Sequence, residues 1–532
     1  MTAATAPARP APRARALPSP AGPARLLRIE LRRSAMLWLL PLLAVLFYIS
    51  AYRPAMDNPP FWNIRSAMLQ SHAMLVLAPL LAGAGAWTGS RDGRRGMADL
   101  IGMTAAPRWA GQLAAWAAAT IWAEALYLAG VAVLYGVTAD QGAWGGPLWW
   151  PVAVGAATVA ASIALGFAAG TCLPGRFTAG LAAVAVFLAL AGGAFAIQDN
   201  AVYAQIWPLN VQGPFPSDSY GIFYPYLPDL AIAQVIFLAG LAAVALGALG
   251  LRARAGGRWL RGAAAAVTAA GLVAAGTGTA LAGTARLTPH GMVIRALHDA
   301  ASDRPVPYTP VCSRGGIPVC LQPAYRAYLP AVTAALAPAL EEVAGLPGAP
   351  VRITQVAVTS VQKDPGNGIS FGGAVLSGSP PLVYLPFSGL TLPGEGGTTT
   401  ADFTLLLRSQ VAAPVLNALV GLAGKQGLRG GGPQGIVVGG PPQSSRGTMA
   451  QLAVAAALAK VAGLLSPAPP GARTRPGGAV LPGARGGASL GTGTERAAFQ
   501  RFAALPAAAR HAWLVTHLAS LRAGRITLSE IP

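Results

Sequence analysis

The sequence has little charge for its length. Only 11% of its 532 residues are Asp, Glu, Lys or Arg, whereas soluble proteins carry about 25%. Hydrophobic residues make up 54% of the chain, and its mean hydropathy is +0.50. This shortage of charge argues against an ordinary soluble enzyme and predicts a polytopic α-helical membrane protein.

Motifs that carry enzyme chemistry are also missing. The chain has no GxxxxGK[ST] phosphate loop and no HExxH zinc pair. His290 and His298 are eight residues apart, and His511 and His517 are six apart, so neither pair has the one-turn spacing of a zinc site. We therefore expect no catalytic site, no cofactor and no metal in this chain.

Six apolar segments are each long enough to cross about 30 Å of hydrocarbon as a helix. They are residues 35–52, 67–89, 110–137, 150–171, 179–197 and 230–250. A seventh segment, 263–283, is rich in Ala and Gly, and its length and lack of charge predict a further span. The expected organisation is a six-span membrane domain over 24–262, a seventh span, and a second domain over 284–532.

Arginine is distributed unevenly between these spans. If the N-terminus is cytoplasmic, sixteen arginines lie in cytoplasmic segments and two in outer segments. The cytoplasmic segments are then 1–34, 90–109, 172–178 and 251–262. The positive-inside rule favours this orientation, which places everything after residue 284 outside. The abundant Ala, Gly and Pro indicate a GC-rich genome, so we expect a multi-pass protein of a bacterial cell membrane.

The net charge of +20 is typical of nucleic-acid binding, but much of the N-terminal charge lies beside apolar spans. We therefore expect contact with membrane lipids and no nucleic acid. Residues 1–23 are rich in Pro, Ala and Arg and have no apolar core, which predicts a disordered cytoplasmic tail. Residues 23–34, PARLLRIELRRS, have the pattern of an interfacial helix on the inner leaflet.

Cysteine is scarce, with three residues in all. Cys172 falls in a predicted cytoplasmic connection. Cys312 and Cys320 bracket CSRGGIPVC, a hairpin-like segment that could close a disulfide, and an oxidising outer compartment would permit the bond. The alternative is two unpaired cysteines in a core.

Residues 284–532 mix helical and alternating patterns, which predicts an α+β extracytoplasmic domain. Residues 467–494 are Gly- and Pro-rich and predict a flexible insert. The expected helices lie near 289–301, 323–344, 400–424, 447–465 and 495–523, and the expected strands at 350–360 and 380–387. This domain could bind anionic headgroups, cell-wall polymer or an acidic peptide, or cap the exit of a pathway.

Residues 90–109, SRDGRRGMADLIGMTAAPRW, gather charge between two apolar spans. Met97, Leu100 and Ile101 are spaced to share one face of a short helix, while Arg94 and Arg95 supply polar residues. Such a helix can seat in a groove on another protein, with its charges fixing the register. The alternative is a loop that faces lipid headgroups and only sets topology.

This stretch resembles the first cytoplasmic loop of type 2 ATP-binding-cassette (ABC-2) permeases. The resemblance rests on Arg91-Asp92, Gly96-Met97, Leu100-Ile101 and the segment from Thr104 to Pro107-Arg108. The family often has Glu where Asp92 stands and Thr where Met97 stands. The resemblance covers residues 24–250, and the N-terminal helix is similar to the family's connecting helix.

The resemblance implies a permease subunit of an exporter. Such a subunit pairs with itself or a homologue and binds a separate cytoplasmic ATPase, which holds ATP and Mg. The residues expected at the ATPase contact are Arg91, Asp92, Arg94, Arg95, Met97, Asp99, Leu100, Ile101 and Arg108. Two other functions stay open: a membrane-anchored outer binding or sensing protein, and a membrane-bound hydrolase.

Two further features concern the spans. Glu124 lies within the third span, where an ionisable residue is costly; it either lines a pathway or is a protonated or hydrogen-bonded structural tie. The outer loop 198–229 carries seven aromatic residues from Tyr203 to Tyr226. These are expected as anchors at the water–lipid boundary, with a gating role as the alternative.

Overall fold

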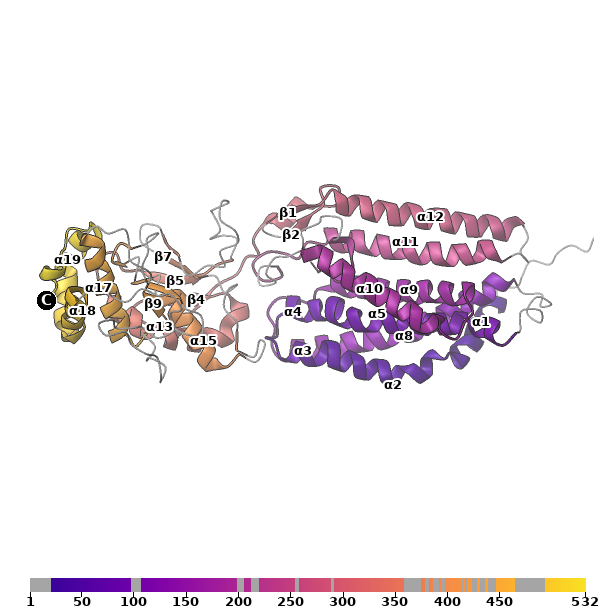
Figure 1. Ribbon diagram of the computed structural model, residues 1–532, viewed down its shortest axis with the longest axis horizontal. Helices are drawn as coiled ribbons and strands as arrows, with labels where there is room; N and C mark the ends of the chain where they lie inside the picture. The colour runs from indigo at the N-terminus through magenta and orange to yellow at the C-terminus, as the bar shows by residue number, and fades with distance from the viewer. Residues whose placement is uncertain are drawn as a thin grey trace, which may run out of the picture.

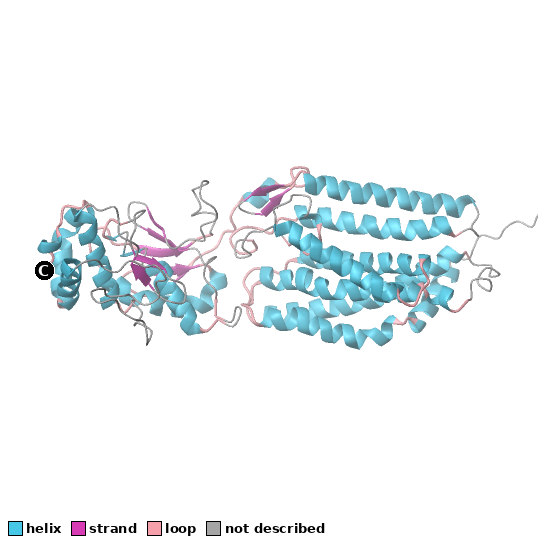
Figure 2. Cartoon of the chain, in the orientation of Figure 1, coloured by secondary structure: helices cyan, strands magenta, loops and turns pink. Residues whose placement is uncertain are grey.

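The computed structural model of the chain has two parts, a helical bundle and an α/β domain beyond one of its ends (Figure 1). Helices dominate both parts, and the strands gather in the second part and at the junction (Figure 2). The structure describes residues 21–96, 107–198, 205–211, 220–253, 258–288, 291–357, 375–377, 382–385, 392–393, 398–412, 415–416, 419–422, 428–430, 436–438, 446–464 and 493–532.

Six helical segments in this described part are long and apolar enough to cross a membrane. They are Met36–Met56, Trp62–Gly89, Arg108–Asp140, Trp149–Cys172, Asp229–Arg252 and Arg258–Gly283. The predicted span at 263–283 is among them. The predicted span at 179–197 forms α10 (Thr178–Gln198), whose apolar part, Thr178–Gly193, is shorter than the others. The chain is therefore a multi-pass membrane protein.

The bundle elements follow one another in chain order. The first span consists of α2 (Met36–Phe47), the π-helix η1 (Tyr48–Tyr52) and α3 (Arg53–Met56), and the second of α4 (Trp62–Ala67), the π-helix η2 (Met68–His72) and α5 (Ala73–Gly89). Before and after them lie α1 (Ala21–Arg33) and α6 (Arg91–Arg94). The remaining helices are α8 (Arg108–Asp140), α9 (Trp149–Cys172), α10, α11 (Asp229–Arg252) and α12 (Arg258–Gly283).

Glycine brings α5 and α9 into close contact. A Cβ at Gly166 or Gly170 of α9 would overlap the carbonyl oxygen of Ala82 or Ala86 on α5. Small residues four apart allow such an approach, and in a membrane, where burial from water gives little attraction between helices, close packing is a main source of association. The same device joins α11 and α12, because a Cβ at Gly271 would lie 2.7 Å from the backbone nitrogen of Val244.

The second domain is built on a five-stranded sheet of order β3-β4-β5-β7-β6. Its strands are β3 (Val311–Cys312), β4 (Val319–Leu321), β5 (Arg352–Gln355), β6 (Val375–Ser377) and β7 (Leu382–Leu385). The three central strands are parallel and the two edge strands are antiparallel. A parallel pair needs a long crossover, and α13 (Leu329–Val343) supplies it between β4 and β5.

The other elements surround this sheet or precede it. Between the bundle and the sheet lie the hairpin strands β1 (Arg286–Thr288) and β2 (Gly291–Val293), followed by the 3-10 helix η4 (Ala300–Asp303). The rest are η5 (Pro323–Tyr328), α15 (Thr400–Leu407), η7 (Arg408–Ala412), β8 (Leu428–Gly430), β9 (Ile436–Val438), α17 (Arg446–Val461), α18 (Gly493–Ala504), α19 (Ala507–Arg522) and η9 (Leu528–Glu530).

The second domain and the bundle share one hydrophobic core at their junction. Phe61, Ile222 and Phe223 from the bundle connections belong to the same buried cluster as the sheet and α13. The rings of Phe61 and Tyr325 lie 4.9 Å apart. Part of the aromatic outer loop therefore holds the second domain in place, a role that differs from the lipid anchoring expected from the sequence.

The expected helix at 289–301 is wrong. Gly291 has φ +126°, a conformation that favours glycine, and begins strand β2 of the hairpin instead. The expected helix at 495–523 is two helices, α18 and α19, because Pro506 cannot continue a helix from the preceding turn. Residues 1–20 of the predicted tail and 467–492 of the predicted insert lie outside the described residues. Residues 21–23 belong to α1 and residues 493–494 to α18, so these ends of the tail and insert are helical.

Candidate partner-binding face of the bundle

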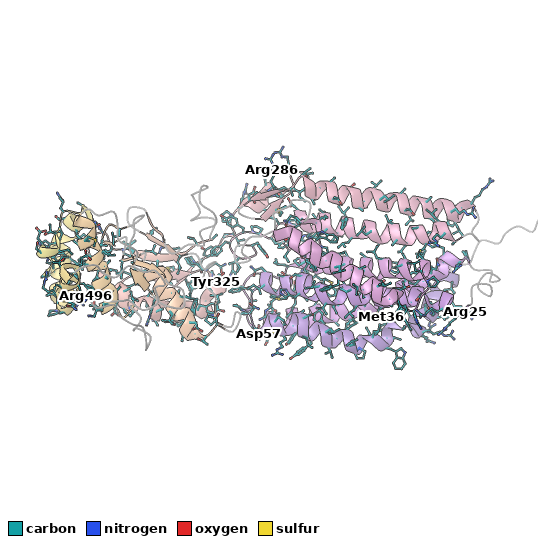
Figure 3. The ribbon with its side chains drawn as sticks, in the orientation of Figure 1. Arg25, Met36, Asp57, Arg286, Tyr325 and Arg496 are labelled. Atoms are coloured by element: carbon teal, nitrogen blue, oxygen red, sulfur yellow. A yellow bond between two sulfur atoms is a disulfide. The ribbon has the colours of Figure 1, made fainter. Side chains whose placement is uncertain are left out.

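The bundle has one end that faces away from the second domain. Arg25 lies at this end, whereas Asp57 and Arg286 lie at the end next to the second domain (Figure 3). We call the far end the basal face and define it by α1, α6 and the connection 172–178. It contains the described part of the charged loop that the sequence singles out.

Arg91 of α6 joins the loop to α1. Its two terminal nitrogens donate to the two carboxylate oxygens of Glu30, each at 3.1 Å. Arg91 Nε also lies 3.4 Å from Asp92 Oδ1. The hydrogen bonds that Arg91 donates to Glu30 raise the pKa of Arg91 above its usual value, against the opposing effect of burial. A bidentate pair fixes orientation as well as distance, so α6 and α1 are held in one register.

Two further contacts hold α6 in place. The guanidinium of Arg94 stacks over the Trp87 ring, 3.7 Å from its centroid, and also donates to Ser90 Oγ. Gly93 packs so closely on Pro174 that a Cβ would overlap the proline ring. The short helix is thus fastened to the end of α5 and to the connection between α9 and α10.

The helix α1 continues this linkage to the third span. Trp122 of α8 donates from Nε1 to the backbone oxygen of Leu31 at 3.0 Å. On the other side of α1, Arg25, Arg28 and Arg32 are exposed and follow one another at helical spacing. The basal face therefore combines an internally bonded frame with an outward stripe of positive charge.

The structure accounts for only some of the residues predicted to contact an ATPase. Arg91 contacts Glu30 and Asp92, and Arg94 contacts Trp87 and Ser90. Arg95 is exposed beside them. Arg108 is exposed at the start of α8. The remaining predicted residues lie outside the described part of the chain; they are Met97, Asp99, Leu100 and Ile101.

Sequence reasoning missed Glu30 and Trp87. Glu30 is the only acidic residue before Asp57, and a lone carboxylate among arginines was an available signal. Trp87 carried no signal, because aromatic residues near span ends are expected as membrane anchors.

Glu124 lies half-buried on α8. Its Oε2 atom is buried and has no hydrogen-bond partner in the part of the chain that the structure describes. The described residues therefore bring no donor to this oxygen, and both interpretations of Glu124 remain predictions.

A buried amide cluster near the other end of the bundle was not anticipated. Gln70 of η2 donates to the backbone oxygens of Pro208 and Asn210 at 2.8 and 2.7 Å. Gln234 of α11 donates to Asn210 O and to Trp207 O, both at 2.8 Å. Two side chains from different spans thus satisfy the carbonyls of segment 205–211, as buried backbone groups require.

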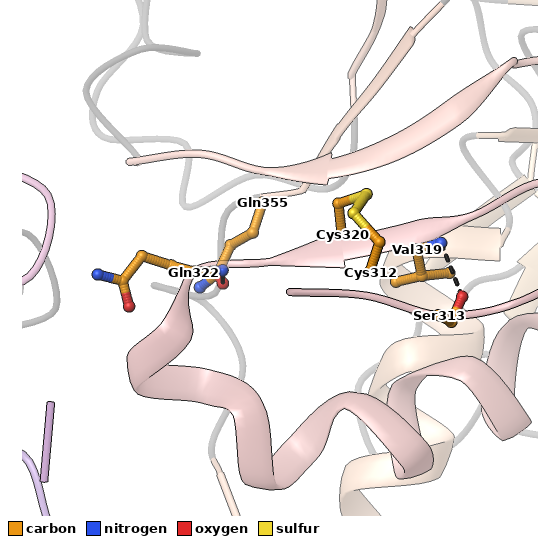
Figure 4. The surroundings of a disulfide bond; sticks show 6 residues. All are labelled: Cys312, Ser313, Val319, Cys320, Gln322 and Gln355. Carbon is orange, nitrogen blue, oxygen red and sulfur yellow. Dashed lines mark hydrogen bonds between the residues drawn. A yellow bond between two sulfur atoms is a disulfide. The ribbon is translucent and has the colours of Figure 1, made fainter. Parts of the chain in front are cut away.

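The predicted disulfide between Cys312 and Cys320 is present. The two cysteines are opposite each other on the antiparallel strands β3 and β4 (Figure 4). Ser313 Oγ accepts a hydrogen bond from Val319 N at 3.0 Å across the same hairpin. The bond is consistent with an extracytoplasmic second domain, because disulfides persist in oxidising compartments.

Within the described residues, no group of three or more His, Cys, Asp and Glu side chains could hold a metal ion. No family model matches the sequence, and no curated protein or solved structure is significantly similar to it. The features that bear on function are therefore the contacts of the basal face, between Arg91 and Glu30 and between Arg94 and Trp87.

Proposed function

We propose that this chain is the permease subunit of an ABC transporter of type 2, and that the transporter is an exporter. The observation that carries the proposal is the bidentate pair between Arg91 and Glu30. It ties the connection after the second span to the helix before the first span, and both elements resemble the parts of this family that contact an ATPase.

The contacts of α6 suggest how a displacement of loop 90–109 is transmitted to the membrane spans. Movement of α6 acts directly on α5, to which Arg94 is held by Trp87. Through Arg91 and Glu30 it also acts on α1, which is bonded to α8 at Trp122. Because α5 packs on α9 through close glycine contacts, displacement at the base would move several spans together.

In this proposal, the ATPase binds ATP and Mg, and the permease binds the ATPase through loop 90–109. The basal face would lie in the cytoplasm, as the arginine distribution favours. Two permease chains, identical or homologous, would form the translocation path between them. The exposed arginines of the basal face would steer an acidic groove of the ATPase and set its register.

Co-purification with the ATPase encoded beside this gene tests the proposal. The Arg94→Glu, Arg95→Glu double variant is expected to lose most ATPase binding, because both charges at the loop are reversed. A control variant, Arg258→Glu with Arg261→Glu, reverses two exposed or half-exposed arginines at the start of α12 and should retain binding. Full binding by the folded loop variant would reject the proposed contact.

A second candidate function is an outer-surface binding or sensing protein that uses its spans as a platform. The shared core of Phe61, Phe223 and the second domain favours it, because a rigidly seated domain suits a receptor. The two functions differ in one outcome: the receptor has no stable ATPase partner.

A further inference from the structure

The connection from α12 to the sheet crosses the beginning of α11. Ile294 N, just after β2, donates to Asp229 Oδ2 at 2.9 Å. Further along, Val306 N donates to Phe223 O at 2.8 Å. Residues 291–306, which we call the strap, are therefore fastened at two points to the segment that leads into α11.

His298 lies between these two points and faces two carboxylates. Its Nδ1 is 3.3 Å from Asp229 Oδ2, and its Nε2 is 3.2 Å from Asp303 Oδ2. The Asp229 side chain is fully buried, whereas that of His298 is 14% exposed and that of Asp303 is 53% exposed. One ring nitrogen thus faces a buried charge and the other a charge in contact with water.

The two neighbouring carboxylates favour the doubly protonated form of the His298 imidazole. A neutral imidazole has one N–H and can serve only one acceptor, whereas imidazolium has two donors and a positive charge. Loss of a proton leaves at least one ring nitrogen with its lone pair facing a carboxylate oxygen. At Asp229 this is costly, because a buried carboxylate needs donors or an opposite charge.

The surroundings add no competing charge that the structure describes. Asp229 is contributed by α11 and Asp303 by η4, while Asp299 accepts a hydrogen bond from Ala301 N. Arg295 and Arg304 of the strap are exposed, and Leu230 of α11 shares a buried apolar cluster with Met292 and Ile294 of the strap. The charge on His298 is therefore balanced by these two carboxylates.

We propose that His298 is a proton-binding latch, which fastens the strap to the start of α11 when protonated and loosens it when the proton leaves. The latch would make the attachment between the bundle and the second domain respond to pH on the side of the second domain. The latch needs no ATPase, so its test is separate from that of the proposed transport function.

The pKa of His298 sets the direction of this response. Burial lowers it, but the hydrogen bond that His298 donates to Asp303 and the negative charges of Asp229 and Asp303 raise the pKa above its ordinary value of 6.5. A raised pKa means that the stabilisation is fully present below pH 6.5 and is lost as the pH rises through the raised value. The strap is thus expected to be tight in acid and loose in alkaline solution.

Hydrogen–deuterium exchange of the full-length chain in detergent micelles tests this proposal. After correction for intrinsic exchange, the amides of the strap should lose protection between pH 6 and pH 9, because the stabilisation by protonated His298 is lost as the pH rises through its raised pKa. His298→Asn should abolish this dependence. Asp303→Asn, at an exposed position where folding is not at risk, should reduce it.

The matched control is His511→Asn, which removes a histidine of the second domain that contacts Ala344 O and should leave the dependence at the strap unchanged. A titration of the five histidines by NMR with selective labelling should place His298 above pH 6.5. Equal strap protection at pH 6 and pH 9 in the unaltered protein would overturn the latch. So would an unchanged dependence in both His298→Asn and Asp303→Asn.

Discussion

The two ends of the helical bundle hold their charges in different ways. Near the second domain, Arg65 and Asp229 are 1% and 0% exposed and are fixed by several contacts each. At the basal face, Arg91 and Glu30 keep 32% and 23% of their side chains exposed, and Arg95 is fully at the surface. Buried charges are costly to unpair, whereas exposed pairs can exchange partners at little cost.

Buried contacts therefore fix the end next to the second domain, whereas the basal face leaves charged side chains available to a partner. The end next to the second domain uses charged and amide side chains to hold the backbone in place. The basal end keeps a bonded frame and leaves positive charge facing outward. Substitutions at the two ends should therefore affect different properties, stability at one and partner binding at the other.

The largest effect on stability is expected from Arg65→Ala. The guanidinium donates to Asn58 O at 3.0 Å and to Gln141 Oε1 at 3.2 Å. Its removal leaves two acceptors without their donor and opens a cavity at a buried position, which should cost about 3 kcal/mol in the free energy of unfolding. Denaturation in detergent micelles measures this loss. Arg53→Ala, at an exposed arginine of the first span, is the control. An equal loss of stability in this control would show that burial of the arginine does not determine the effect.

A somewhat smaller effect is expected from replacing the disulfide. Cys312 and Cys320 are eight residues apart in sequence, and closing such a short loop stabilises the folded state by about 2.5 kcal/mol through the entropy of the unfolded chain. The Cys312→Ser, Cys320→Ser variant should lower the denaturation midpoint of the second domain by a matching amount. Cys172→Ser should leave that midpoint unchanged, and a drop of the same size there would contradict the assignment.

The smallest effect on stability is expected at the basal face. Glu30→Gln removes one charge of a partly exposed pair and should cost about 1 kcal/mol or less. The same change should weaken ATPase binding, because α1 and α6 lose their common register. Glu341→Gln, at an exposed carboxylate of α13, should change neither property. If Glu30→Gln destabilised the protein as much as Arg65→Ala, the basal face would be a structural anchor like the other end.

The membrane spans could be predicted from the sequence because a long apolar run is a strong signal. An uninterrupted apolar run predicts a span wherever it occurs, so all seven apolar segments form helices close to the expected bounds. The segment at 263–283 is rich in Ala and Gly. It still forms a long helix, α12, in which glycines such as Gly271 allow direct packing on α11. The cysteine hairpin was predicted from spacing and compartment together.

Other features depend on partners far apart in the sequence. Glu30 and Arg91 are 61 residues apart, and Gln70 meets Gln234 across 164, so no local pattern pairs them. Strands β1, β4 and β6 have three residues each and are too short to establish a period, whereas the four-residue strands β5 and β7 lie within the two segments expected to form strands. His298 carried no useful spacing to another histidine, and only the fold brings Asp229 to it.

The proposed function requires that the basal face lies in the cytoplasm and the second domain outside the cell. Labelling of intact cells with a membrane-impermeant maleimide tests it most directly, in a Cys172→Ser background. Cys312, whose side chain is exposed, should react after mild reduction, whereas an added Arg95→Cys substitution should react only after the cells are opened. Labelling at position 95 in sealed cells, with no labelling of the two native cysteines, would contradict the account.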